Sequence, residues 1–183
     1  MSAATVTPPV VTPITKENAA PQIQPIFDKL THVFGHMPGM YGIMARVPDA
    51  LTNFMALYSA VINKGSVEAK YKELAYLKSA LVNGCEYCFR AHSASARKHG
   101  VTEDQLKALN FFKRSQLFDA KEKAVILYAE RVTRGASALR ATALQELKEY
   151  FNDDQIVELT LTVAIANFTN RFNDALSITP DIG

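Results

Sequence analysis

The chain has 183 residues, of which 48% are hydrophobic and 21% are charged, and its 20 Lys and Arg against 18 Asp and Glu leave a net charge of +2. This composition is typical of one globular domain whose core is large enough to stand without disulfides or metal, and it excludes fibrous and disordered chains. So small a net charge, without an Arg-rich run, gives no electrostatic case for binding nucleic acid.

The first 20 residues combine Thr, Val and Ala with three prolines, Pro8, Pro9 and Pro13. Proline interrupts helices and central strands, so we expect a flexible N-terminal arm over residues 1–20 and a helical domain over residues 21–183. The alternative is that the arm lies on a neighbouring subunit. No stretch has the pattern of a secretory signal or the roughly 20 apolar residues of a membrane span. We therefore expect a cytoplasmic protein that does not enter a membrane.

Helical periodicity begins after the arm. Three amphipathic stretches end at glycines suited to the left-handed backbone that follows a helix: Gly35, Gly65 and Gly84. A short segment rich in Gly and Met, residues 35–47, separates the first stretch from the second. A new helix is then expected from the cysteines to Gly100.

The second half of the chain carries two capping boxes, in which a polar side chain and a Glu or Gln three residues later satisfy each other's backbone. They are Thr102 with Gln105 and Asp119 with Glu122. The last run, residues 153–176, begins with two acids and is apolar on more than one side, so we expect it to be the most buried helix. No strand-like alternation is present. The sequence therefore predicts an all-α, single-domain bundle of about eight helices.

The only two cysteines, Cys85 and Cys88, lie in the segment NGCEYCFRAH, with His92 four residues after the second. On a helix the three side chains share one face, and Cys88 and His92 are direct neighbours. This spacing lets the imidazole take the thiol proton, with Cys85 within disulfide reach. The helix N-terminus favours a thiolate at Cys85, which we also expect to be the more exposed thiol. In a reducing cytosol such a pair is more often catalytic or metal-binding than a structural disulfide.

Glu73 lies on the preceding predicted helix beside leucines, so its carboxylate points toward packing rather than into open solvent. Such an acid is a candidate to orient the base, and a structural salt bridge to a lysine is the alternative. Two other interpretations of the cysteines stay open. One is zinc, which is disfavoured because Cys85 and His92 lie about 10.5 Å apart along a helix axis. The other is a pair of buried inert thiols.

Glu73, eleven intervening residues and then C-x-x-C-x-x-x-H resemble the alkylhydroperoxidase D-like branch of the carboxymuconolactone decarboxylase family. FGHMPGMYGIMARVP at 34–48 and NFTNRFNDAL at 167–176 are similar to two further segments of the family, and the resemblance covers most of residues 25–178. It implies an all-α fold that assembles as a homotrimer or homohexamer. It also implies a cysteine pair that cycles between dithiol and disulfide, with no cofactor or metal.

By this resemblance Cys88 attacks the peroxide, Cys85 resolves the product, His92 is the base and Glu73 belongs to the proton relay. Tyr87 stands where the best-known members carry a histidine and is a candidate relay. We therefore expect a peroxidase or thiol–disulfide oxidoreductase for small-molecule hydroperoxides, reduced by a protein or lipoyl thiol. The alternatives are a lactone decarboxylase, which works without a redox cysteine pair, and a zinc-bound or inert helical oligomer that binds a partner.

Overall fold

The computed structural model describes residues 10–135 and 141–182, and within these ranges the chain is all-helical. Its α-helices are α1 Gln24–Phe34, α2 Gly39–Met44, α3 Pro48–Val61, α4 Ala69–Asn83, α5 Glu86–Lys98, α6 Glu103–Ala108, α7 Ala120–Gly135, α8 Ala141–Lys148 and α9 Asp153–Ala175. Short 3-10 helices lie at Lys16–Asn18, Pro21–Ile23 and Leu109–Phe111. The predicted all-α single domain is confirmed, with nine α-helices in the described ranges where about eight were expected.

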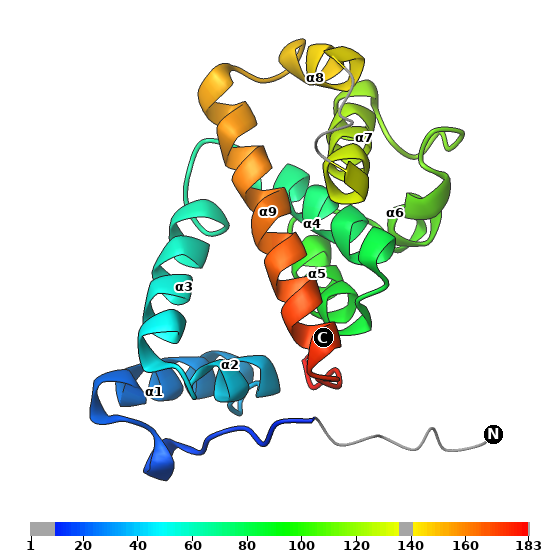
Figure 1. Cartoon of the computed structure of the whole chain (residues 1–183). Helices are drawn as coiled ribbons and strands as arrows, with labels where there is room; N and C mark the ends of the chain where they lie inside the picture. The colour runs from blue at the N-terminus through cyan, green and yellow to red at the C-terminus, as the bar shows by residue number, and fades with distance from the viewer. Residues whose placement is uncertain (1–9, 136–140, 183) are drawn as a thin grey trace, which may run out of the picture.

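Helix α4 is the centre of the fold, packed against α5, α7 and α9 (Figure 1). Its residues from Lys72 to Ala80 are all buried, so the helix has no solvent face along this stretch. The expectation that residues 153–176 form the most buried helix is wrong. Helix α9 is apolar on several sides, but this chain covers only some of them and leaves Val157, Leu161 and Phe168 exposed.

Local signals place the ends of the helices. Gly84 has a left-handed φ of +78° directly after α4, a conformation that costs a residue with a Cβ about 1–2 kcal/mol. Cys85 follows as the N-cap residue of α5, one position before the predicted first turn. The capping box of Thr102 and Gln105 begins α6 as predicted. Asp119 and Glu122 likewise exchange hydrogen bonds with each other's backbone N–H at the start of α7.

Residues 10–20 of the predicted N-terminal arm lie along α2 and the end of α9. The backbone N–H of Val10 donates to the Leu176 carbonyl at 3.1 Å, and that of Ile14 to the Gly42 carbonyl at 2.9 Å. Pro13 packs so closely that a Cβ added at Gly42 would lie 2.9 Å from it. This part of the arm therefore packs on its own chain. Residues 1–9 of the arm lie outside the described residues.

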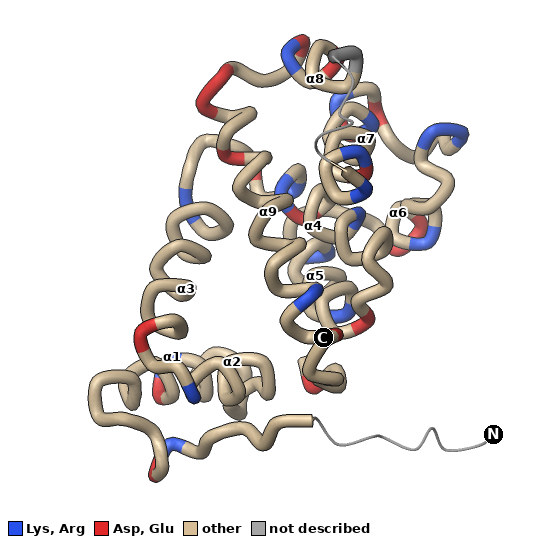
Figure 2. Tube along the Cα trace, in the orientation of Figure 1, with Lys and Arg blue, Asp and Glu red and all other residues tan. Residues whose placement is uncertain are grey.

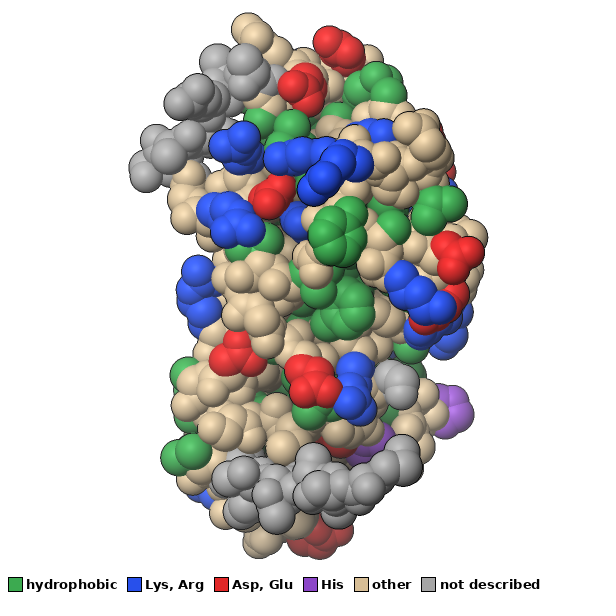
Figure 3. All heavy atoms as spheres, turned by 90° about the vertical axis from the view of Figure 1, so that its right-hand side faces the viewer, with side chains coloured by type: hydrophobic (Ala, Val, Ile, Leu, Met, Phe, Trp, Pro, Cys, Tyr) green, Lys and Arg blue, Asp and Glu red, His purple; other side chains and the backbone are tan. Residues whose placement is uncertain are grey.

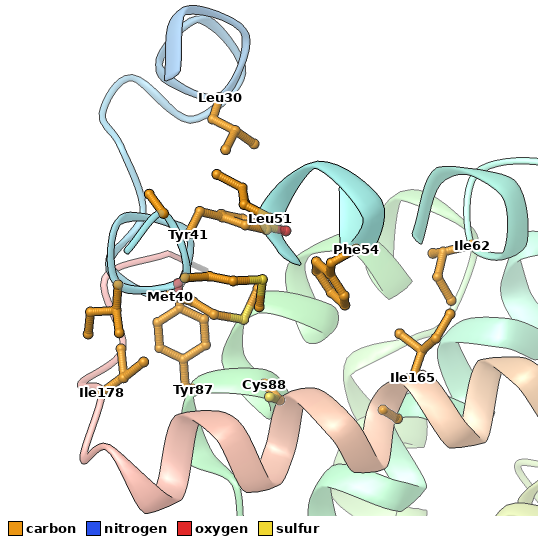
Figure 4. Close-up of a cluster of buried hydrophobic side chains, with 14 of the residues drawn as sticks. Leu30, Met40, Tyr41, Leu51, Phe54, Ile62, Tyr87, Cys88, Ile165 and Ile178 are labelled. Carbon is orange, nitrogen blue, oxygen red and sulfur yellow. The ribbon is translucent and has the colours of Figure 1, made fainter. Parts of the chain in front are cut away.

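Helices α1 to α3 form a separate group beside α9 (Figure 1), and a cluster of buried hydrophobic side chains lies between this group and the rest of the fold (Figure 4). A cavity of about 1060 Å³ opens here, lined by residues of α1, α3, α4 and α5. The arrangement therefore places a ligand-sized space against the helix that carries the cysteines.

Charged side chains lie along most of the helices (Figure 2). On the face shown in Figure 3, Lys and Arg side chains gather in the upper half. Glu130 on α7 lies 3.4 Å from Arg134 of the same helix and 3.7 Å from Lys113, which precedes the helix. Within the described ranges, no helix is long and apolar enough to cross a membrane.

Candidate active site

Both cysteines are free thiols buried at the start of α5, with exposed fractions of 1% for Cys85 and 2% for Cys88. Cys88 lies beside α9, near Met40 and Tyr87 (Figure 4). The cavity reaches Cys88 but is not lined by Cys85. The expectation that Cys85 is the more exposed thiol is therefore wrong, because the N-cap position of α5 is covered by the core.

Cys88 receives hydrogen-bonding groups from α9. The Nδ2 group of Asn173 donates to Cys88 Sγ at 3.2 Å, and Thr169 Oγ1 lies 4.0 Å from the same sulfur. Hydrogen bonding to the Cys85 thiol lowers the pKa of Cys88 to about 6 against the effect of burial, and Asn170, Asn173 and the charge of His92 act in the same direction. The structure therefore favours a thiolate at Cys88 near neutral pH.

The predicted thiolate at Cys85 is not the arrangement found. Hydrogen bonding to Cys88, together with burial, raises the pKa of the Cys85 thiol. The opposite shifts of the two thiols favour a neutral Cys85 beside a Cys88 thiolate, and the amide of Asn173 adds to the stabilisation of that thiolate. The helix N-terminus should lower the pKa of Cys85, but the effects of Cys88 and of burial on this pKa are larger.

Glu73 and His92, predicted from the sequence as relay and base, are brought together. His92 Nδ1 lies 2.8 Å from Glu73 Oε2, and Ser95 Oγ donates to Glu73 Oε1 at 2.7 Å. Burial alone raises the pKa of Glu73, but the positive charge of His92 and the hydrogen bonds from His92 and Ser95 lower it below its ordinary value. An ionised Glu73 thus fixes the orientation of the imidazole through its contact with Nδ1.

Two tyrosines that the sequence reasoning missed fix the other sides of His92. The ring of Tyr76 stacks on the imidazole with centroids 3.4 Å apart, and its hydroxyl hydrogen-bonds to Thr169 beside Cys88. The hydroxyl of Tyr58 lies 3.4 Å from His92 Nε2. Tyr76 follows Glu73 by three positions on α4, and this helical spacing could have indicated that the two side chains share a face. Tyr58 lies on α3, and no spacing in the sequence relates it to His92.

The ring nitrogens of His92 therefore face Glu73 and Tyr58, and no hydrogen bond joins His92 to Cys88 in this conformation. The sequence predicts a direct contact through which His92 takes the proton of the Cys88 thiol, and this contact is not formed here. The charge of His92 nevertheless lowers the pKa of Cys88. Burial raises the pKa of Tyr58 well above its ordinary value, and Tyr41, Glu73 and Cys88 add to the effect. Tyr58 is thus a neutral hydroxyl placed between the base and the cavity.

Tyr87, the candidate relay between the cysteines, is buried in the hydrophobic cluster near Met40 and Ile178 (Figure 4). Its hydroxyl has no hydrogen-bond partner among the described residues. Burial raises its pKa, and Asp181 raises it further. Tyr87 lines the cavity, but no hydrogen-bonded path connects it to Cys88 or His92.

A group of asparagines ties the end of α4 to α9 behind the cysteines. Asn83 Nδ2 donates to Asn167 Oδ1 at 3.1 Å and to Asn170 Oδ1 at 2.8 Å. The Nδ2 group of Asn170 has no hydrogen-bond partner among the described residues, and Asn170 helps to lower the pKa of Cys88. These bonds hold the amides of α9 in place next to the thiol.

In the part of the chain that the structure describes, no group of three or more His, Cys, Asp or Glu side chains is placed to hold a metal ion. His92 is already engaged with Glu73 and Tyr58, and Cys88 with Asn173. The zinc interpretation of the cysteine pair therefore finds no set of ligands around it.

The model of the Carboxymuconolactone decarboxylase family matches residues 48–131, a segment that contains Glu73, both cysteines and His92. Over this segment the chain is similar to the family, and its relatives in sequence and structure include proteins described as alkylhydroperoxidase D-like. The alkyl hydroperoxide reductase AhpD of Hyphomonas neptunium is 37% identical over 81 residues, which cover 44% of this chain and 39% of that protein. The uncharacterized protein YdfG of Bacillus subtilis is 27% identical over 114 residues, 62% of this chain and 78% of that protein.

Two solved structures are similar over nearly the whole chain. An uncharacterized peroxidase-related protein from Ralstonia eutropha, described as an alkylhydroperoxidase AhpD core, has a TM-score of 0.83 at 19% identity and covers 98% of this chain and 94% of its own. The debrominase Bmp8 has a TM-score of 0.81 at 24% identity, with coverage of 93% and 91%. At these identities the likeness concerns the fold.

Proposed function

We propose that this protein is a thiol-dependent peroxidase that reduces organic hydroperoxides with Cys88 and Cys85. The observation that carries the proposal is the placement of Cys88. It is a buried thiol with amide donors on one side, a Glu73–His92 pair one helical turn away, and a cavity of about 1060 Å³ in front of it. This combines an activated nucleophile, an oriented base and a second thiol in one site.

The reaction proceeds in two steps. The Cys88 thiolate attacks one oxygen of the hydroperoxide, an S–O bond forms as the O–O bond breaks, and the alkoxide leaves as an alcohol after taking a proton. Cys88 is then a sulfenic acid, oxidised by two electrons. The Cys85 thiol attacks this sulfur, a disulfide forms and water leaves. An external dithiol, a protein or lipoyl thiol, returns the pair to the reduced state by exchange.

The proton for the leaving alkoxide comes from Tyr58. This hydroxyl lines the cavity, lies 3.4 Å from His92 Nε2, and has a pKa raised by burial, so it is protonated at neutral pH. Tyr58 gives its proton to the alkoxide, and the protonated imidazole of His92 replaces it. Glu73 stabilises the imidazolium before the transfer.

We also propose that the chain assembles as a homotrimer or homohexamer. Helix α9 exposes three large apolar side chains along its length, Val157, Leu161 and Phe168, and a second copy is the simplest cover for them. Sedimentation at micromolar concentration tests this point, and a monomer would contradict it.

A second candidate function is reductive dehalogenation of an aromatic ring, favoured by the four tyrosines, Tyr41, Tyr58, Tyr76 and Tyr87, that line the cavity beside Cys88. Here the dithiol would supply two electrons, giving the dehalogenated ring, halide, a proton and the disulfide. Lactone decarboxylation uses no redox thiol pair, so the site supports it less.

The experiment is a single-turnover reaction of the reduced protein with a panel of organic hydroperoxides and, separately, with 2,3,4-tribromopyrrole, the compound bound in a solved structure of a Bmp8 variant. The peroxidase proposal expects one peroxide consumed and two thiols lost per chain. Bromide release without peroxide consumption would favour the second candidate, and two thiols that survive both reactions would contradict both.

A further inference from the structure

The cavity beside Cys88 extends along one face of α5. Its lining includes Cys88 in the first turn, His92 one turn later, Ser95 and, in the last turn, Lys98. The ten positions from Cys88 to Lys98 correspond to about 15 Å along the helix axis. Burial falls in the same direction, since Cys88 and His92 are buried, Ser95 is half-buried and Lys98 is exposed. The cavity thus connects the thiol to the surface over this length.

The walls between these two ends are largely apolar. The side chains from α1, α3 and the residue after α3 include Ile26, Leu30, Val33, Met55 and Ile62. Ligand pockets for drug-sized molecules span about 300–1,000 Å³, so a cavity of this size is much larger than hydrogen peroxide or a short alkyl hydroperoxide requires. An extended apolar chain fits both its length and its walls.

Both carboxylates in the lining already have partners. Glu73 is bound by His92 and Ser95, and Asp181 accepts a hydrogen bond from the backbone N–H of Gly39 at 2.6 Å. Neither is left to hold a cationic group of a substrate.

The three lysines in the lining differ in this respect. Lys72 is buried, donates to the Val61 carbonyl at 2.7 Å and pairs with Glu158. Lys29 and Lys98 form no ion pair with any residue of the described ranges. A cavity whose unpartnered charges are two ammonium groups attracts an anion.

We propose that the substrate is the hydroperoxide of a long-chain carboxylic acid. Its carboxylate binds Lys98 and Lys29, its apolar chain lies along α5, and its peroxide reaches Cys88. This inference rests on the proposed peroxidase function and names the substrate class of the same site. It differs from a peroxidase for small neutral hydroperoxides, which would gain nothing from a charged end about 15 Å away from the sulfur.

The test compares linoleic acid hydroperoxide with its methyl ester in single-turnover reactions below micelle-forming concentrations. No reductant is present, so an anionic thiol reductant cannot contribute. We expect the acid to react about tenfold faster than the ester at low ionic strength, and the ratio to shrink as salt screens the exposed lysines. An acid-to-ester ratio near one at low salt would overturn the inference.

Charge reversal locates the anion site. Lys98→Glu and Lys29→Glu should each lower the acid-to-ester ratio by about fivefold, the factor expected for one partly exposed charge pair. Lys107→Glu, at an exposed lysine of α6 outside the cavity lining, is the matched control and should leave the ratio unchanged. A ratio that both cavity variants retain would overturn the assignment.

Calorimetry with linoleic acid itself, which carries no peroxide, separates this inference from the proposed function. Binding that is stronger than that of methyl linoleate and weakened by Lys98→Glu supports the anion site even if no peroxide is reduced. Reduction of neutral peroxides without preferential binding of the acid would contradict the inference and leave the peroxidase proposal standing.

Discussion

Cys88 lies between two sides of the protein that differ in chemistry. On α4 and α5, Glu73 and His92 form a titratable pair 2.8 Å apart, while on α9 a neutral amide, Asn173, donates to the sulfur at 3.2 Å. A neutral donor favours the thiolate at any pH, whereas a titratable pair can give and take protons. We therefore expect substitutions on α9 to act mainly through the Cys88 thiolate, and substitutions of the Glu73–His92 pair to act mainly through proton transfer.

The largest effect should come from replacing Cys88, whose sulfur lies between the two sides. In Cys88→Ser, peroxide consumption in a single turnover should fall to background, because the remaining thiol of Cys85 is buried and does not line the cavity. Peroxide loss followed by absorbance or by a coupled dye measures this. If this variant consumes peroxide at the wild-type rate, Cys85 and not Cys88 is the nucleophile.

On the titratable side, Glu73→Gln keeps the shape of the residue but removes its charge. We expect the rate of thiol oxidation to fall roughly 10³-fold, because the imidazolium loses its stabilising partner. Circular dichroism should show an unchanged helical fold. Glu103→Gln, at an exposed acid of α6, is the control, and a wild-type rate for Glu73→Gln would assign the acid a structural role.

Helix α3 sharpens the comparison through Tyr58. Tyr58→Phe keeps the ring and removes the hydroxyl that faces His92, so the rate with alkyl hydroperoxides should fall about 10²-fold. Because the phenol is not a donor to the sulfur, the pH at which the Cys88 thiolate forms should stay close to that of the wild type. Tyr150→Phe is the matched control, and an unchanged rate in Tyr58→Phe would remove the phenol from the proton path.

On the neutral side, Asn173→Ala should act through the thiolate alone. Loss of one hydrogen bond to a charged sulfur should raise the pKa of Cys88 from about 6 by about one to two units. The thiolate then forms at higher pH, so the rate should fall about two- to tenfold at pH 7 and recover as the pH rises above the new value.

Thiolate absorbance recorded against pH, alongside the rate, gives both quantities. The control is Asn110→Ala, at an exposed asparagine far along the chain from the site. A variant whose rate stays low at high pH would contradict a role limited to the pKa.

The titratable side could be predicted from the sequence because Glu73, Cys85, Cys88 and His92 lie within twenty positions on two consecutive helices. Helical spacing sets which of them share a face. The neutral side could not be predicted, because Asn173 and Cys88 lie 85 positions apart and contacts between such distant residues leave no periodic pattern in the sequence. Tyr58 is hidden for the same reason, 34 positions before His92.

The errors have related causes. The helix N-terminus is a local feature that predicts a lowered pKa at Cys85, whereas the amides that help to lower the pKa of Cys88 come from α9. The apolar residues on several sides of the segment 153–176 predict the most buried helix. A single chain covers only part of its apolar surface. The all-α class and the capping boxes, which depend on neighbours in sequence, were predicted correctly.

The central claim is that Cys88 is the thiolate that attacks the peroxide and Cys85 is the thiol that resolves it. The most direct measurement is mass spectrometry of Cys85→Ser after one turnover with a hydroperoxide. We expect one oxygen on Cys88, accumulating as a sulfenic acid at close to the wild-type rate of peroxide loss, because no resolving thiol remains. A Cys88 that stays reduced while the wild-type protein consumes peroxide under the same conditions would contradict the claim.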